Sequence, residues 1–404
     1  MTEQIPFPSF SVPEDFLWGA ATAAHQVEGN NVSSDWWALE HSNSPVIAEP
    51  SGDAADHFNR WPEDLDILAS LGLNSYRFSL EWSRIEPERG AVSMAAIDHY
   101  KRMVAGCVER GLTPVVTLQH VTLPAWFRRA GGWQADGAAE LFASYAETVL
   151  PVLNEGAEWV ATINEPGLQP LMSALHRGDQ AALNAWHGGP MPLASDTEIE
   201  SLITAHRAAR DVVRAGTDAH AGWTVVLHDV QHEEEGRAAA EEWFETFEAP
   251  YLRAARDDDF VGVQNYTRSR FNSAGEVLPG PEDRMTAIWE YYPEALGNAV
   301  RLAKSVVGDV PIVVTENGVP TDDDTERVEF INRALRSLDA AIADGVDVRG
   351  YLHWSAIDNF EWALGYGPRF GLIGFDHTTF ARSIKPSARW YGELARRHSL
   401  ALTP

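Results

Sequence analysis

The chain has 404 residues, of which 45% are hydrophobic and 22% are charged, and 15 of them are Trp. This composition is ample for a large core, and α/β barrels often reach this length as one domain. The formal net charge of −28 argues against nucleic acid and anionic membrane surfaces as partners, because both carry the same sign of charge.

The beginning of the chain and its cysteine content indicate the compartment. Met1–Pro13 is polar and has neither the basic start nor the apolar stretch of a secretory signal, and no run of 18 apolar residues occurs anywhere. The only cysteine, Cys107, excludes an intrachain disulfide. We therefore expect a soluble, cytoplasmic protein. The sequence does not indicate its oligomeric state.

Short β-type runs alternate with amphipathic helical patterns along the chain. The predicted strands are Phe16–Ala20, Ser75–Ser79, Pro114–Leu118, Trp159–Ile163, Gly222–Leu227, Phe260–Val263, Pro311–Thr315 and Gly350–His353. Helical patterns between them include Pro62–Leu71, Ala95–Arg110 and Arg327–Ala343. This alternation predicts a single (β/α)8 TIM barrel domain over residues 1–404. A doubly wound open sheet is the alternative, but Gly19–Thr22 is not the glycine-rich phosphate turn typical of that fold.

Two β-branched apolar runs stop at a glutamate. One is Thr162–Pro166 (Thr-Ile-Asn-Glu-Pro) and the other is Val313–Gly318 (Val-Val-Thr-Glu-Asn-Gly). A carboxylate at the end of a buried strand destabilises the fold unless it is solvated, ion-paired or required for function. Either segment alone could be a solvated loop. Together, Glu165 and Glu316 suggest two facing carboxylates, the smallest set of catalytic groups that cleaves a glycosidic bond.

Other polar residues also follow the predicted strands, where the catalytic groups of a barrel gather. They are His25, Gln26, Glu28, Arg77, Glu81, His120, Asn164, His228, Asp229, Tyr266, Asn317, Trp354, Asp358, Glu361 and Trp362. This set suits a polyhydroxylated neutral ligand, because hydroxyls need donors and acceptors and pyranose faces need flat apolar platforms.

With these motifs the chain resembles glycoside hydrolase family 1, the β-glucosidase and β-galactosidase group, nearly from end to end. The segments that carry the resemblance are Phe16–Gly29, Tyr76–Ile85, Thr162–Pro166, Thr315–Gly318, Trp354–Trp362, Gly365–Tyr366 and Arg369–Leu372. Each short motif alone is moderately specific. Their joint presence in the right order makes the resemblance strong.

The resemblance implies a retaining mechanism with two carboxyl groups. Glu316 would attack the anomeric carbon, and Glu165 would protonate the leaving oxygen and later activate water. Arg77 and Tyr266 would hydrogen-bond Glu316 and keep it anionic, and Asn164 would bind the sugar 2-hydroxyl. Repulsion from the anionic Glu316 is the expected cause of a raised pKa at Glu165.

The resemblance also implies a subsite for the terminal sugar. Its hydroxyl-binding residues would be Gln26, His120, Glu361 and Trp362, with Trp354 as a stacking floor. Phospho-β-glycosidases of this family carry a basic cluster in the C-terminal block. Here residues 358–366 contain no Lys or Arg, and Glu361 would repel a phosphate. The sugar should therefore be unphosphorylated.

The chain departs from the family pattern both beside the terminal sugar and along the leaving-group side. Gln264-Asn265-Tyr266 replaces the usual Asn-Tyr-Tyr, and His120–Pro124 lacks the usual Trp. Trp186–Pro190 stands where a longer motif is common, and residues 272–288 form a compact segment. We therefore expect an open mouth, and a sugar site that is better predicted than the leaving-group site.

The resulting prediction is a retaining exo-β-glycosidase that releases one terminal sugar from small β-glycosides. Glucose is the expected sugar, with galactose or fucose tolerated. A transglycosidase would use the same residues and stays open as an alternative. A non-catalytic sugar-binding barrel is disfavoured, because a binder needs no acid and nucleophile.

No cofactor or metal is expected, since no Cys/His cluster has ligand spacing. The acidic runs Glu233–Glu235, Asp257–Asp259 and Asp322–Asp324 are predicted to be solvated loops.

Overall fold

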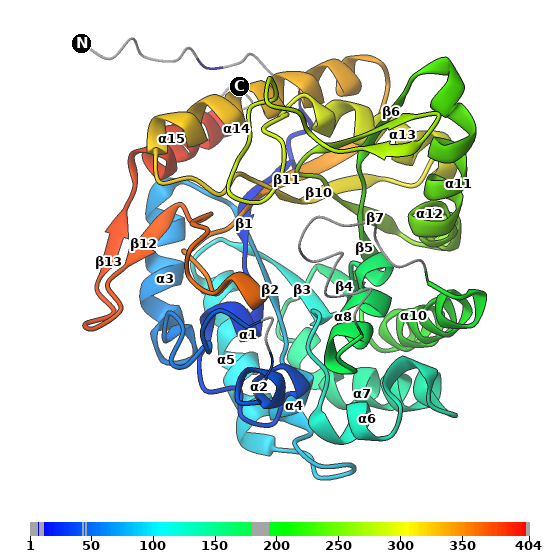
Figure 1. The fold of residues 1–404 in the computed structure, drawn as a ribbon. Helices are drawn as coiled ribbons and strands as arrows, with labels where there is room; N and C mark the ends of the chain where they lie inside the picture. Colours follow the sequence, from blue (N-terminus) through cyan, green and yellow to red (C-terminus); the bar gives the residue numbers. More distant parts are fainter. Residues whose placement is uncertain (1–6, 8–11, 43, 45–46, 180–193, 401–404) are drawn as a thin grey trace.

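The computed structural model describes residues 7, 12–42, 44, 47–179 and 194–400. Eight parallel strands close into a barrel in the order β1-β11-β10-β7-β5-β4-β3-β2 (Figure 1). They are β1 (Leu17–Ala21), β2 (Ser75–Ser79), β3 (Thr113–Gln119), β4 (Trp159–Asn164), β5 (His220–Val226), β7 (Phe260–Gln264), β10 (Ile312–Asn317) and β11 (Val348–Trp354). The predicted (β/α)8 barrel is therefore confirmed, and the open sheet is excluded.

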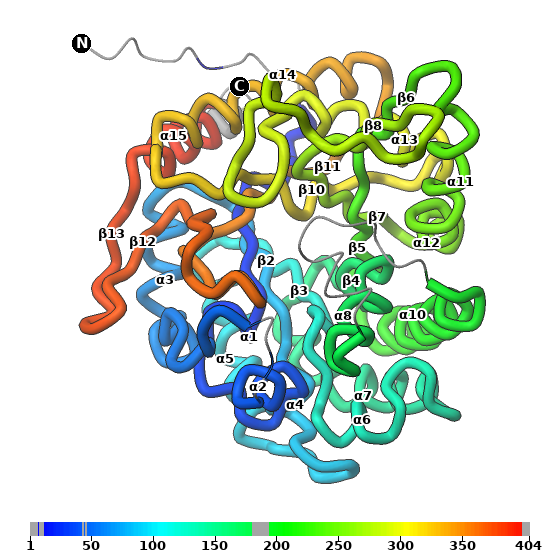
Figure 2. Tube along the Cα trace, in the orientation of Figure 1, coloured from blue at the N-terminus to red at the C-terminus, as the bar shows by residue number. Residues whose placement is uncertain are grey.

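Helices surround the barrel. In chain order they are α1 (Ala24–Val27), α2 (Asp35–Glu40), α3 (His57–Leu71), α4 (Trp82–Ile85), α5 (Met94–Glu109), α6 (Ala125–Arg129), α7 (Ala138–Leu153), α8 (Gln169–His176), α10 (Asp196–Gly216), α11 (Arg237–Phe247), α12 (Ala249–Ala254), α13 (Ala295–Val307), α14 (Asp324–Ala343) and α15 (Pro386–Leu400). The helix α15 contacts both α14 and the early helix α3, which closes the outer ring (Figure 2).

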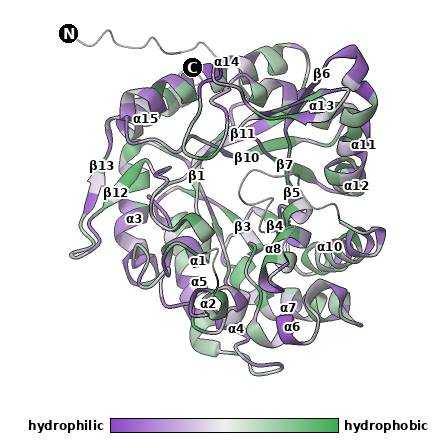
Figure 3. Ribbon diagram, in the orientation of Figure 1, coloured by the Kyte–Doolittle hydropathy of each residue, from purple (hydrophilic) through white to green (hydrophobic). Residues whose placement is uncertain are grey.

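Local sequence signals define the helix ends. Ser195 and Glu198 form a capping box at the start of α10, and the Ser93 hydroxyl accepts from the Ala96 N–H at the start of α5. Gly72 caps the C-terminus of α3, and its φ of 88° is easily reached only without a Cβ. Hydrophobic and hydrophilic residues both occur on outer helices, as expected of amphipathic helices with one buried face (Figure 3).

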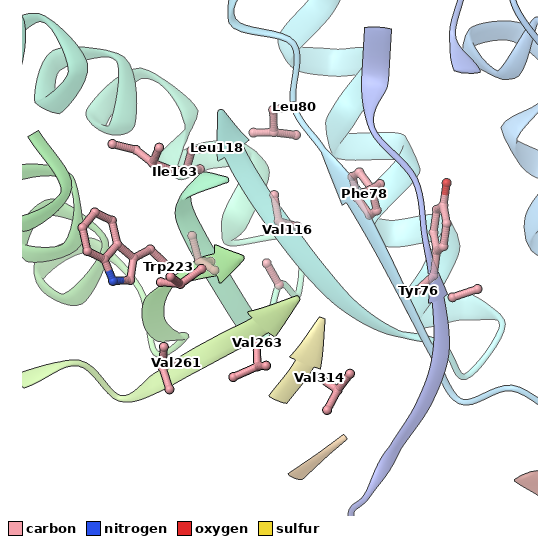
Figure 4. Close-up of a cluster of buried hydrophobic side chains, with 14 of the residues drawn as sticks. Tyr76, Phe78, Leu80, Val116, Leu118, Ile163, Trp223, Val261, Val263 and Val314 are labelled. Carbon is pink, nitrogen blue, oxygen red and sulfur yellow. The ribbon is translucent and has the colours of Figure 1, made fainter. Parts of the chain in front are cut away.

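Side-chain alternation along the strands separates the core from the site. In β2, Tyr76 and Phe78 belong to the hydrophobic core, whose residues on neighbouring strands include Val116 and Leu118 (Figure 4). Arg77 lies between them in sequence, and successive strand residues point to opposite faces. The guanidinium therefore enters the barrel, where it is fully buried.

The described part of the chain also contains two small sheets outside the barrel, and neither was predicted. β6 (Asp229–His232), β8 (Arg268–Asn272) and β9 (Gly275–Val277) form one; β12 (Ile373–Phe375) and β13 (Arg382–Ile384) form the other.

The prediction for the run Asp257–Asp259 was wrong at its central residue. Asp258 is only 7% exposed, and its carboxylate lies 3.1 Å from His206 Nε2 and 3.0 Å from an Arg210 nitrogen. A buried carboxylate needs such partners, and they come from α10, which is distant in sequence. The sequence pattern around the run could not reveal them.

A buried ion pair ties α3 to the β12–β13 hairpin and gives a stability prediction. Asp64 accepts from Arg382 at 2.6 Å and 2.8 Å and from His57 Nδ1 at 2.7 Å, with all three side chains nearly inaccessible. Asp64→Ala would leave the guanidinium buried and unpaired. We expect the free energy of unfolding to fall by about 3–5 kcal/mol, measured by urea denaturation.

The same helix offers a matched control. Asp66 pairs with Arg110 at 2.6 Å, but its side chain is 66% exposed. Asp66→Ala should cost less than about 1 kcal/mol, because water replaces the lost partner. Equal losses for the two variants would show that the Asp64 pair does not fasten the hairpin.

Candidate active site

A cavity of about 320 Å³ lies at the C-terminal ends of the barrel strands. Eight of the ten predicted site residues line it: Gln26, His120, Glu165, Tyr266, Glu316, Trp354, Glu361 and Trp362. The other two, Arg77 and Asn164, are fully buried and bonded to the lining residues. The structure thus brings together all ten, from seven barrel strands and the loops that follow them.

Glu316 is held by one donor on each carboxylate oxygen. An Arg77 nitrogen lies 2.5 Å from Oε1, and the Tyr266 hydroxyl donates to Oε2 at 2.5 Å. Arg77 is itself oriented, because its Nε donates to the Thr117 hydroxyl at 3.0 Å. Charge-assisted bonds of this kind stabilise the ionised carboxylate and fix its position.

Asn164 is locked by three donors on its amide oxygen. Arg77 donates at 2.6 Å, the Thr224 hydroxyl at 2.9 Å and Gln264 Nε2 at 2.8 Å. The amide nitrogen therefore faces the opposite way, 3.3 Å from His120 Nε2. Sequence reasoning named Gln264 only as a departure and missed Thr224. The available signal was the inward position of Thr224 on β5, between outward Trp223 and Val225.

Glu165 stands at the junction of β4 and the next loop. Its φ of 46° is left-handed, its N–H donates to the Thr224 oxygen at 2.9 Å, and Pro166 follows as the first residue of the 3₁₀ turn η2 (Pro166–Leu168). A non-glycine residue in this conformation is uncommon and requires support from its surroundings. The turn breaks the strand so that the Glu165 side chain lines the cavity.

The two carboxyls have unequal surroundings. Burial raises the pKa of Glu165 well above its usual value, and the charges of Glu316 and Glu361 raise it further, opposed only in part by Arg77. Burial also raises the pKa of Glu316, but Arg77 and the Tyr266 hydrogen bond oppose that rise directly. A proton shared by the pair therefore rests on Glu165. Repulsion by Glu316, the cause expected from the sequence, does raise the pKa of Glu165, but burial raises it more.

Gln26 and Glu361 form the polar end of the cavity. Asn359 Nδ2 donates to Glu361 Oε2 at 2.7 Å, and Gln26 Nε2 lies 3.4 Å from the same oxygen. Gln26 Oε1 is buried without a partner among the described residues, so it can accept from a ligand hydroxyl. Burial raises the pKa of Glu361 to about 7. These groups meet the needs of a neutral polyol.

Aromatic rings make up the rest of that end. The His120 ring stacks on Trp354 at 5.7 Å and 13°, and Trp362 stacks on His25 at 5.7 Å and 4°. His25 in turn hydrogen-bonds the buried Glu40 at 2.8 Å. Burial and the Arg77 charge lower the pKa of His120 well below its usual value, so its ring is neutral. Flat apolar surface beside hydrogen-bonding groups fits a pyranose.

Within the described parts of the chain, no group of three or more His, Cys, Asp or Glu side chains could hold a metal ion. None of the helices described there is long and apolar enough to cross a membrane.

A barrel with two carboxyls at the ends of β4 and β10, one supported by Arg and Tyr, defines the class of two-carboxylate glycoside-cleaving enzymes. The sequence model of glycosyl hydrolase family 1 matches residues 9–181 and 244–400. The chain belongs to this family. It is accordingly a retaining O-glycosyl hydrolase, which confirms the predicted activity.

Relatives and solved structures agree with this assignment. Thermostable beta-glucosidase B of Thermobispora bispora is 34% identical over 96% of this chain and 92% of its own length. Beta-glucosidase A of Acetivibrio thermocellus is 30% identical, covering 96% and 98% of the two chains. The crystal structure of β-glycosidase BGL167 superposes with a TM-score of 0.89 at 43% identity, covering 97% and 99%. A Thermotoga maritima beta-glucosidase in complex with glucoimidazole gives 0.86 at 28% identity, covering 96% and 99%.

The residues that depart from the family pattern lie in different parts of the site. Gln264 holds Asn164, as described above, and Val121 lines the cavity with a φ of 64° where the family has Trp. The compact segment 272–288 includes Glu276 and Ile288, which also line the cavity. Trp186–Pro190 lies outside the described residues.

Proposed function

We propose that the chain is a β-glucosidase that removes one unphosphorylated terminal sugar from small β-glycosides, with Glu316 as nucleophile and Glu165 as acid and base. The observation that carries this proposal is the asymmetry of the two carboxyls. Both oxygens of Glu316 accept hydrogen bonds, from Arg77 and Tyr266, whereas burial and two neighbouring carboxylates favour the protonated form of Glu165.

The chemistry proceeds in two displacements. Glu316 attacks the anomeric carbon while the bond to the leaving oxygen breaks and Glu165 gives that oxygen its proton. The Glu165 carboxylate then takes a proton from water, whose oxygen attacks the same carbon and breaks the bond to Glu316. Two inversions return the sugar as its β-anomer. Asn164 is oriented to bond the 2-hydroxyl, a contact that strengthens in the transition state.

Gln26 and Glu361 support the choice of a glucose-type sugar. They supply acceptors at the polar end of the cavity, and either orientation of a 4-hydroxyl can reach them, so galactosides and fucosides are included. Lys and Arg are absent among residues 358–366, which supports an unphosphorylated sugar. His120 and Trp362 complete the hydroxyl-binding set, with Trp354 as the platform.

The proposal includes a single catalytic domain in the cytoplasm. Cys107 is buried in α5, which is compatible with a reducing compartment. The net charge of −28 disfavours nucleic acid as a partner.

Hydrolysis of 4-nitrophenyl α- and β-glycosides, with the product anomer followed by NMR, tests the proposal. Turnover of the β-glucoside with initial release of β-glucose supports it, and absence of turnover of every β-glycoside by folded protein would refute it. Added methanol in the same assay separates a hydrolase from a transglycosidase, because a transglycosidase would give methyl β-glucoside as its main product.

A further inference from the structure

The cavity lining has a polar part and an apolar part. Gln26 and Glu361, which follow β1 and β11, form the polar end described above. The segments after β4 and β5 contribute the apolar part, which we call the apolar wall. It consists of Leu168, Leu171, Met172, Val226, Trp243 and Phe247.

The position of Glu165 identifies what the apolar wall contacts. A general acid must lie beside the oxygen that leaves, so the leaving group extends on the Glu165 side of the sugar. Leu168 ends the turn that Glu165 begins, and Leu171 and Met172 follow on α8. α11 closes against this turn, since a Cβ added to Gly167 would lie 2.9 Å from the Phe247 backbone oxygen.

Aromatic packing makes the α11 part of the wall firm. The rings of Trp243 and Phe247 lie 5.0 Å apart, and the Trp243 ring meets His228 edge-on at 5.2 Å and 83°. His228 Nδ1 lies 2.8 Å from Oε1 of Glu248, a carboxylate that is completely buried. The imidazole is therefore fixed, and the wall presents flat carbon surface.

Among the residues that the structure describes, few polar groups are available on this side. The cavity lining there includes His228, Thr267, Ser269 and Glu276. One nitrogen of His228 is used by Glu248, the Thr267 hydroxyl donates to the Glu290 oxygen at 2.9 Å, and Glu276 is exposed at the rim. A second sugar would place several hydroxyls against carbon, and hydroxyls buried without partners are costly.

We propose that the leaving-group side takes an apolar alcohol with a flat hydrocarbon body, such as an arylalkyl alcohol or a phenol, in preference to a second sugar. The inference rests on the proposed function and specifies its substrate class. Apolar area removed from water on the wall favours such a leaving group, and the few polar side chains described on this side offer a saccharide little compensation for its dehydration.

The test compares kcat/KM for 2-phenylethyl β-glucoside, ethyl β-glucoside and cellobiose. The first two release primary alcohols of similar acidity and differ mainly in apolar area, so their ratio reports on the wall and not on the chemical step. We expect the phenylethyl glucoside to exceed the ethyl glucoside by about 30-fold, as burial of a phenyl group predicts. It should exceed cellobiose by about 10-fold or more.

Two wall variants and one control connect the ratio to the structure. Trp243→Ala and, independently, Leu168→Gln should each lower the phenylethyl-to-ethyl ratio several-fold. Trp61→Ala removes a half-buried Trp that packs against Gly106 of α5, outside the cavity, and should leave the ratio unchanged. A phenylethyl-to-ethyl ratio near one in active enzyme, or cellobiose as the best of the three, would overturn this inference alone. Failure to hydrolyse any β-glucoside would overturn the proposed function and this inference with it.

Discussion

Glu316→Gly is expected to abolish hydrolysis, lowering kcat/KM for 4-nitrophenyl β-glucoside on the order of 10⁵-fold, as removal of a nucleophile does in other covalent enzymes. The variant should still transfer glucose from α-glucosyl fluoride to an alcohol acceptor. The fluoride leaves from the face that the missing carboxylate occupied, and Glu165 takes the proton of the attacking hydroxyl. Fluoride release and a β-linked product, identified by NMR, are the measurements.

The control is the double variant with Glu165→Ala, which lacks the base and should lose the transfer as well. Thermal unfolding establishes that each variant is folded. Hydrolysis near the wild-type rate in Glu316→Gly would remove the nucleophile role from Glu316. The Arg77 and Tyr266 bonds to its oxygens would then have only a structural meaning.

The fold was predictable because its signals are local and repeat. Parallel barrel strands are buried on both sides, so each is a short apolar run, and every run predicted from sequence overlaps a barrel strand, with ends displaced by no more than two residues. The amphipathic patterns at Pro62–Leu71 and Arg327–Ala343 likewise fall within α3 and α14. The two outer sheets escaped prediction because β9, β12 and β13 are three residues each and largely half-buried or exposed.

The site was predictable as a set of residues but not as a network. Strand-end position and the family motifs named the ten residues that the structure gathers. The bond from Arg77 to Asn164 joins β2 to β4, and Thr224 and Gln264 reach the same amide oxygen from β5 and β7. Such contacts exist only once the barrel closes, because they cross its interior between distant parts of the sequence.

The order of the pKa causes was also inaccessible to sequence. Charges can be counted from residue types, so repulsion by Glu316 was foreseeable. Burial depends on how completely the surrounding loops cover Glu165, and that follows only from the folded chain. The larger cause is therefore the one that sequence could not supply.

Glu165→Ala should separate substrates by the basicity of their leaving groups. For 2-phenylethyl β-glucoside, whose alcohol needs a proton to leave, we expect kcat/KM to fall by about 10³–10⁴-fold. For 2,4-dinitrophenyl β-glucoside, whose phenolate leaves unaided, the rate constant of glycosyl-enzyme formation should fall less than about 10-fold. Stopped-flow measurement of the first turnover isolates this step from the slowed hydrolysis of the intermediate.

The pH dependence of kcat/KM gives a second test of the acid role of Glu165. Because the pKa of Glu165 is raised, its acid form persists to higher pH than that of an ordinary glutamic acid, and wild-type kcat/KM should decline as pH rises through that pKa. This alkaline decline should disappear in Glu165→Ala with the dinitrophenyl substrate. Azide, a nucleophile that carries no proton to remove, should restore breakdown of the intermediate and yield β-glucosyl azide.

A matched control distinguishes loss of the acid from general damage to the cavity. Glu361→Gln removes the charge of another half-buried carboxyl of the same cavity. It should lower the rates on both substrates by similar factors, since Glu361 contacts the sugar that they share. Equal losses on both substrates in Glu165→Ala, with the alkaline limb retained, would assign the proton to another group. The raised pKa of Glu165 would then reflect its burial beside Glu316 without a role in protonating the leaving group.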